Sequence, residues 1–484
     1  MAAENLDRSL VSGIGWTALS RWLSQIVSWA ATLYAARHLK PGDYGLVSMA
    51  MLPIGLVRLI EDFGFDTVLV QNRQLDRQAI ARLGGLVLIV ALLLTAGLAI
   101  VAPAVARFFA EPLLTTLIML GSTMILFDAI QVVPRALLQR ELRYRTLAFI
   151  YLAQVIVTSA VLVLAARGGV GAPTLILNNI SGALIATILL VLAAPLLPRW
   201  PRGLRALRDP LLQGWRMIVS RGAWYGYSSA DSTAIGRFLG KDALGHYSFA
   251  VTFSNTAVQE VTALVTRVVP GIFSSAQKDP AALRRYFLLL TEAIAYIAFP
   301  MCAGVALTAD VLVAAALGPQ WGDVVDPLRV LCLYVAITVA QILVSHVLLW
   351  TGRFRANMWL SLFALLVIPI AVVIGAQFSI TGVAWALAIG FPIASLPGAV
   401  LAVRAIQLPW QDYGRALLPP TVACAAMAAV VLLVRPYLPP GMEPLKSLGL
   451  QALAGATTYI VALAVVYRDR VRVLYDLIRS AGAS

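Results

Sequence analysis

The sequence predicts an all-α, polytopic membrane protein with about 14 transmembrane helices. Two observations support this fold class. Hydrophobic residues make up 60% of the 484 and charged residues only 12%, whereas soluble domains carry about 25% charged residues. The apolar residues also fall into long runs that short polar loops separate. A water-soluble globule needs a polar shell that this composition cannot supply, so lipid is the expected solvent.

Each predicted span is an apolar run that can cross the hydrocarbon core, which takes about 20 residues of helix. The first run is too long for a signal peptide and only Arg8 precedes it as a basic residue, so we expect it to remain as a span. No loop is long enough for a folded domain, and function is expected among the helices. The candidate spans are 14–37, 44–66, 83–106, 113–138, 146–167, 173–197, 215–237, 243–270, 286–308, 326–351, 358–376, 380–403, 417–435 and 447–468.

The Lys and Arg residues that give the chain a formal net charge of +14 are distributed unequally between the two sides of the predicted spans. About 22 of them fall in the loops and tails on the side of the N-terminus, and about 8 fall on the other side. By the positive-inside rule, both termini are expected in the cytoplasm. Basic residues clustered in this way argue against a nucleic-acid partner.

The three cysteines lie in apolar runs without paired spacing, and we interpret them as small hydrophobic residues rather than metal ligands. They are Cys302, Cys332 and Cys424. The sequence therefore indicates no metal and no cofactor.

A shift of 200 residues aligns the first two predicted spans of each half without a gap. Arg21 then falls on Arg221, and Gly45 falls on Gly245. Because six spans separate the two copies and six is even, we expect parallel repeats that hold a substrate between them. The predicted organisation is an N-terminal lobe of six spans, a C-terminal lobe of six, and two additional helices with a cytoplasmic tail, at 1–200, 201–405 and 406–484.

Residues 37–45 read Arg-His-Leu-Lys-Pro-Gly-Asp-Tyr-Gly. This resembles the R-x-L-x-P-x-D-Y-G segment of the polysaccharide transporters, the Wzx-type lipid-linked oligosaccharide flippases of the multidrug/oligosaccharidyl-lipid/polysaccharide (MOP) exporter superfamily. Residues 62–64, 139–144 and 318–321 are similar to further landmarks of that family. The likeness extends from about residue 10 to 405, and the count of twelve plus two helices agrees with it.

The resemblance implies a flippase rather than an enzyme, with no cofactor and no ATP-binding domain. Its substrate would be an oligosaccharide on undecaprenyl pyrophosphate, moved from the inner to the outer leaflet of the bacterial cytoplasmic (inner) membrane by alternating access around a cationic cavity. The pathways served would be those of exopolysaccharide, capsule or O-antigen. Expected partners are membrane lipids, a polysaccharide polymerase and other export machinery.

An ionisable side chain at the centre of a span costs at least about 2.5–3.5 kcal/mol, so each one needs a reason. The first and seventh predicted spans each carry a polar stripe on one face, at i, i+4, i+7 and i+11. Arginines in these stripes and in the neighbouring spans favour a pyrophosphate site, because guanidinium groups stay charged and bind phosphate bidentately. The predicted substrate-binding residues are Arg21, Arg58, Arg221, Arg267, Gln25, Ser28, Tyr225 and Ser228.

A structural interpretation of the same arginines stays open. Arg21 could pair with Asp62, and Arg58 with Glu61, while Arg135 and Arg267 could reach the interface from helix ends. The acidic residues within the spans are candidates for ion coupling or for such internal pairing: Glu61, Asp62, Asp231, Glu260 and Glu292.

Three other functions compete with polysaccharide export. A flippase for the peptidoglycan precursor lipid II belongs to the same superfamily. A multidrug antiporter should favour acidic over basic residues in its cavity, and arginine lies on equivalent faces of both halves here. A membrane glycosyltransferase or polymerase would need a substantial outer loop with catalytic residues, whereas the loop at about 309–325 contains neither Lys nor Arg.

Overall fold

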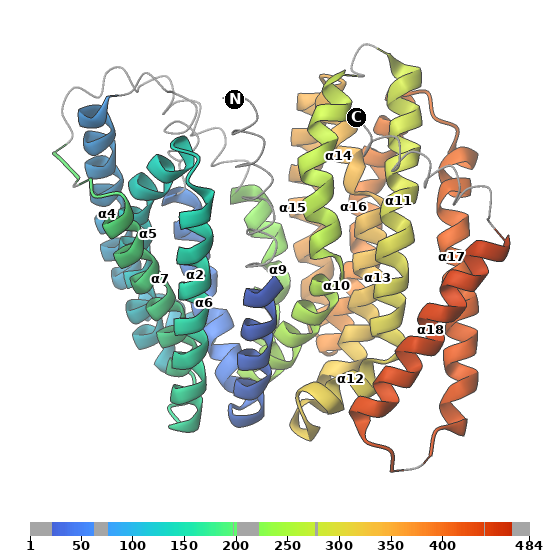
Figure 1. Cartoon of the computed structure of the whole chain (residues 1–484), viewed down its shortest axis with the longest axis horizontal. Helices are drawn as coiled ribbons and strands as arrows, with labels where there is room; N and C mark the ends of the chain where they lie inside the picture. The colour runs from blue at the N-terminus through green and yellow to red at the C-terminus, as the bar shows by residue number, and fades with distance from the viewer. Residues whose placement is uncertain are drawn as a thin grey trace, which may run out of the picture. The chain divides into compact units, whose positions relative to one another are not determined.

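The computed structural model describes residues 22–61, 76–196, 198–200, 222–275, 279–439 and 441–466. Within these ranges the regular structure is helical and contains no strand, which confirms the all-α fold class. In each half of the chain, long helices run alongside one another (Figure 1).

The first compact unit comprises Met1–Gly245. Its core lies where α2 packs on α5 and where α5 packs on α4 and α7. Its helices span 22–38, α2 Pro41–Glu61, α4 Arg77–Phe109, α5 Leu113–Arg140, α6 Tyr144–Arg167, α7 Pro173–Ala193, 222–228, α9 Ala230–Phe238 and the start of α10, Gly240–Ser275.

The second compact unit comprises His246–Ser484 and contains the remainder of α10. Here α11 packs on α13 and α17, and α16 packs on α13 and α15. The three-part division at residues 200 and 405 stays a prediction. The helices are α11 Pro280–Leu307, α12 Ala309–Ala316, η2 Pro319–Val324, α13 Val325–Ala340, α14 Ile342–Trp350, α15 Phe354–Ala376, α16 Ile380–Ala405, α17 Trp410–Val434, η3 Arg435–Tyr437 and α18 Pro444–Val466.

The helices of the described residues include 10 that are long and apolar enough to cross a membrane. A described helix also overlaps every predicted span. Two of the predicted spans are interrupted, one at Ser229 before α9 and the other at Gln341 between α13 and α14. The protein is therefore a multi-pass membrane protein, while the number of fourteen spans stays a prediction.

Helix α2 meets the start of α10 in a contact that follows the 200-residue shift. A Cβ atom added to Gly45 would lie less than 3.0 Å from the carbonyl oxygen of Lys241, and one added to Gly245 would meet the carbonyl oxygen of Pro41 in the same way. Because 41 and 241 differ by the same shift as 45 and 245, the two contacts are reciprocal. The backbones approach too closely for any side chain, so both positions require glycine.

We expect Gly45→Ala to lower the thermal unfolding temperature of the purified protein, because a backbone carbonyl cannot rotate away from the added methyl group. Overpacking of this kind costs about 1–3 kcal/mol. Gly245→Ala should have a similar effect, and the double variant should lose less than the sum because both changes disturb one crossing. The control is Gly97→Ala in α4, where nothing lies within 4 Å. A Gly45→Ala variant as stable as this control would contradict the described contact.

Candidate functional site

The central feature of the candidate site is an ion pair between two helices of the first unit. Arg58 lies in the last turn of α2, and its Nη2 donates to Asp128 Oδ2 on α5. The two side chains remain 42% and 26% exposed. Arg58 is therefore internally paired, but its side chain is still partly exposed. The alternative pairing with Glu61 stays a prediction, because the side chain of Glu61 lies outside the described residues.

Asp128 belongs to a polar face of α5 that also carries Gln131 and Arg135, at i, i+3 and i+7. Arg135 Nη2 donates to Gln131 Oε1 at 2.6 Å. Gln131 is only 3% exposed, and its Nε2 donates to Thr187 Oγ1 at 3.0 Å and to the Ala183 carbonyl at 3.1 Å, both on α7. Arg135 is thus bound to a residue that α7 anchors, and its reach to the interface stays a prediction.

The ion pair and this network bring two guanidinium groups and one carboxylate to one region of α2 and α5. Arg135 is also close enough to interact electrostatically with Asp128. These three side chains carry one excess positive charge. The spacing on α5 was visible in the sequence, but nothing there indicated that Asp128 faces Arg58.

Tyr225 contacts α2 near the same site. Its hydroxyl donates to the Leu52 carbonyl at 2.8 Å, and the absence of a side chain at Gly55 makes room for the ring. Ser228, one turn on, is exposed and donates to the Tyr225 carbonyl at 3.2 Å. Tyr225 is thus fixed one to two turns from Arg58 along α2. Its substrate-binding role stays a prediction.

The other predicted substrate-binding residues divide into described and undescribed positions. Gln25 and Ser28 are exposed on the helix over 22–38. Arg267 lies on α10, but its side chain lies outside the described residues, and Arg21 and Arg221 lie outside them altogether. Of the predicted pyrophosphate site, the structure describes the side chains of Arg58, Gln25, Ser28, Tyr225 and Ser228.

Among the predicted acidic residues, Glu292 in the second unit is the most buried of those described. It is 6% exposed and accepts a hydrogen bond from the Tyr296 hydroxyl at 2.9 Å. Tyr459 on α18 donates to the Tyr296 carbonyl at 2.9 Å, so the residue that binds Glu292 is also bound to α18.

The remaining acidic candidates are less informative. Asp231 lies in the first turn of α9, where its Oδ1 accepts from the Ser232 amide at 2.6 Å. The side chain of Glu260 and all of Asp62 lie outside the described residues. Within the described ranges, no group of three or more His, Cys, Asp or Glu residues could hold a metal ion.

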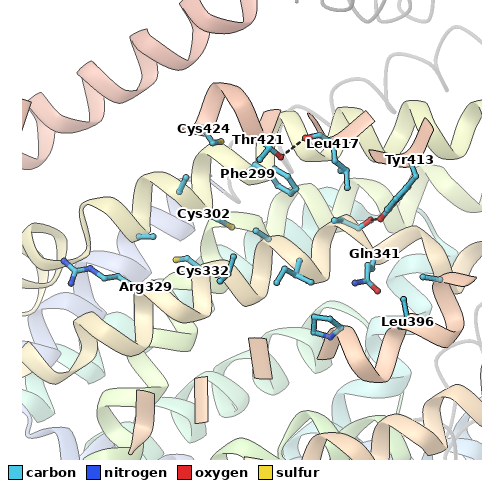
Figure 2. Close-up of a pocket in the computed structure, with 18 of the residues that line it drawn as sticks. Phe299, Cys302, Arg329, Cys332, Gln341, Leu396, Tyr413, Leu417, Thr421 and Cys424 are labelled. Atoms are coloured by element: carbon cyan, nitrogen blue, oxygen red, sulfur yellow. Dashed lines mark hydrogen bonds between the residues drawn. The ribbon is translucent and has the colours of Figure 1, made fainter. Parts of the chain in front are cut away.

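The second unit contains an open apolar cavity of about 620 Å³ between α11, α13, α16 and α17. Its lining includes all three cysteines of the chain, Cys302, Cys332 and Cys424 (Figure 2). Arg329 lies toward one end of this lining and Gln341 toward the other (Figure 2). Arg329 is ion-paired with Asp326 at 3.3 Å and with Asp310 at 3.7 Å. The cavity thus offers an apolar wall whose charged end is neutralised.

Comparison with known proteins identifies relatives along nearly the whole chain. Teichuronic acid biosynthesis protein TuaB of Bacillus subtilis (strain 168) is 24% identical over 477 residues, which are 96% of this chain and 97% of that protein. Lipopolysaccharide biosynthesis protein WzxC of Escherichia coli (strain K12) is 21% identical over 382 residues, 78% of this chain and 77% of that protein.

Among solved structures, the lipid II flippase MurJ in its inward closed conformation matches with a TM-score of 0.74 and 12% identity. The match covers 94% of this chain and 99% of the MurJ chain. At this identity the likeness shows the fold alone. The fold defines a multi-pass membrane protein built like this flippase. The family described as Polysaccharide biosynthesis protein matches residues 35–326. The chain belongs to this family, which confirms the resemblance that its sequence motifs indicated.

Proposed function

We propose that this protein is a flippase that moves an undecaprenyl-pyrophosphate-linked oligosaccharide from the inner to the outer leaflet of the cytoplasmic membrane. The observation that carries the proposal is the side chain of Arg58, which lies in the last turn of the apolar helix α2 and is 42% exposed although it is ion-paired. An arginine that faced hydrocarbon would be costly, so its exposure indicates a polar space among the helices. A pyrophosphate is the ligand that a guanidinium group binds bidentately.

The relatives favour a glycan over other cargo. The names of TuaB and WzxC place those two proteins in teichuronic acid and lipopolysaccharide biosynthesis. Lipid II is the competing cargo that the likeness to MurJ suggests, but that likeness concerns the fold. A multidrug cation would fit poorly beside Arg58 and Arg135, because like charges repel.

Transport in this proposal needs no nucleotide-binding domain, and the protein acts as a transporter rather than an enzyme. Gly236, Gly240 and Lys241 approximate a phosphate-binding loop but have neither its spacing nor its following Ser or Thr. A doubly anionic headgroup that moves outward travels along an inside-negative potential, which contributes about 2.3 kcal/mol per charge and 100 mV. Glu292 and Asp231 are the candidates for any coupled ion whose side chains are described.

Gene deletion tests the proposed function. Cells without this protein should lose a surface polysaccharide and accumulate its lipid-linked oligosaccharide, and the wild-type gene should restore export. Normal surface polysaccharide together with accumulation of lipid II would overturn the assignment in favour of the peptidoglycan precursor.

The apolar cavity of the second unit suits part of the polyprenyl chain, because its lining is mostly hydrocarbon. We expect Ala336→Trp to reduce export several-fold at an unchanged protein level, since the indole would fill space beside Leu333 and Cys332. Ala336→Ser preserves the volume and should retain export. The measurement is surface polysaccharide normalised to protein in the membrane, and equal export by both variants would argue against a role for the cavity.

A further inference from the structure

The ion pair of Arg58 places a carboxylate where the proposed function needs a phosphate. Asp128 Oδ2 accepts from Arg58 Nη2, and the oxygens of a diphosphate would accept from the same group. Both anions cannot take the same N–H in the same geometry. A substrate that binds Arg58 must therefore displace Asp128 or share the guanidinium group with it.

The surroundings hold Asp128 in place while Arg58 remains accessible. One turn along α5, Gln131 is buried and anchored to Thr187 and Ala183 of α7. Arg58 reaches Asp128 from α2 with a long side chain that is 42% exposed, against 26% for the carboxylate. The mobile partner in an exchange is therefore the arginine, which has more rotatable bonds and more open space.

We propose that Asp128 is a displaceable counterion that competes with the diphosphate of the substrate for Arg58 and so promotes release. This inference rests on the proposed function. A transport site must bind its cargo strongly enough to capture it and weakly enough to let it leave. A permanently free arginine would favour capture only. Asp128 neutralises Arg58 in the empty site, and Arg58 returns to it when the substrate departs. Asp128 is a positioning residue because it acts through Arg58.

The test measures undecaprenyl pyrophosphate binding by the purified full-length protein in detergent, with uncharged undecaprenol as the control lipid. Asp128→Asn keeps the shape of the side chain and removes its charge. We expect it to tighten binding of undecaprenyl pyrophosphate about tenfold and to slow lipid transfer in proteoliposomes. Asp128→Glu retains the competing charge and should stay close to the wild type.

A double-variant cycle separates this role from a structural one. On an Arg58→Ala background, Asp128→Asn should no longer tighten binding, because the group for which Asp128 competes is gone. If the contact with Arg58 were merely structural, Asp128→Asn would weaken binding when Arg58 is present and would have no effect once Arg58 is removed. If Asp128→Asn folds normally and binds undecaprenyl pyrophosphate no more tightly than the wild type, the inference is wrong.

The same experiment distinguishes failure of this inference from failure of the proposed function. A wild-type protein that binds undecaprenyl pyrophosphate no better than undecaprenol, and does not transfer it, would overturn the proposed function. Binding by the wild type that depends on Arg58 but does not respond to Asp128→Asn would overturn the role of Asp128 alone.

Discussion

Arg58→Ala is expected to abolish polysaccharide export while the protein remains folded in the membrane. The substitution removes the accessible guanidinium group of the described site and leaves Asp128 without its partner. Loss of one charge-assisted contact to the substrate costs about 1.5–3 kcal/mol, which corresponds to a loss of about tenfold or more. Surface polysaccharide per amount of membrane-inserted protein is the measurement.

Two further variants define what this result means. Arg58→Lys keeps the charge but loses the bidentate geometry, so we expect partial export. Arg107→Ala is the matched control, because Arg107 also lies in the last turn of a membrane helix, α4. Export that Arg58→Ala leaves intact, or that Arg107→Ala abolishes equally, would argue against a substrate site at Arg58.

The double variant Arg58→Met with Asp128→Leu is expected to be nearly as stable as the wild type and inactive in export. Removing one partner of an ion pair leaves an uncompensated charge, whereas replacing both with apolar residues of similar volume is often neutral or stabilising. Thermal unfolding should therefore separate the double variant from Arg58→Ala, which should be the less stable. Export should be lost in both.

This comparison discriminates between the two interpretations of Arg58, as a substrate-binding residue and as a structural partner of Asp128. If Arg58 serves only to hold α2 against α5, the stable double variant should export normally. If Arg58 binds substrate, recovery of stability should bring no recovery of export. Thermal stability and export, measured on the same preparations, thus give opposite predictions for the two roles.

The fold could be predicted from sequence because lipid imposes a simple requirement on the chain. Any segment that crosses the membrane must be helical and mostly apolar, so spans such as 83–106 and 380–403 correspond to the long helices α4 and α16. The breaks at Ser229 and Gln341 were not predicted. Hydropathy shows where a span lies along the chain but does not show whether the helix of that span is continuous.

The repeat was visible in the sequence, whereas its physical reason was not. The shift of 200 residues aligned Gly45 with Gly245, but only the structure shows each glycine against a carbonyl of the other helix. A glycine in an apolar helix can serve packing, kinking or close approach. The choice among these depends on a neighbour that is distant in the chain.

The same limit applies to the candidate site. Arg58 could be singled out because an arginine within an apolar run is costly. Its partner could not be identified, since Asp128 is 70 residues away and the packing of α2 on α5 follows from tertiary structure. Local spacing favoured Glu61 as the partner, because spacing reports only neighbours on the same helix.

Lipid transfer by the purified protein in proteoliposomes tests the central claim most directly. The measurement follows undecaprenyl-pyrophosphate-linked oligosaccharide from one leaflet to the other, for the wild type and for Arg58→Ala at equal reconstitution. We predict transfer by the wild type that exceeds protein-free vesicles and falls about tenfold or more in Arg58→Ala. Equal transfer by both proteins, or wild-type transfer no faster than that of empty vesicles, would contradict the proposed function and its site.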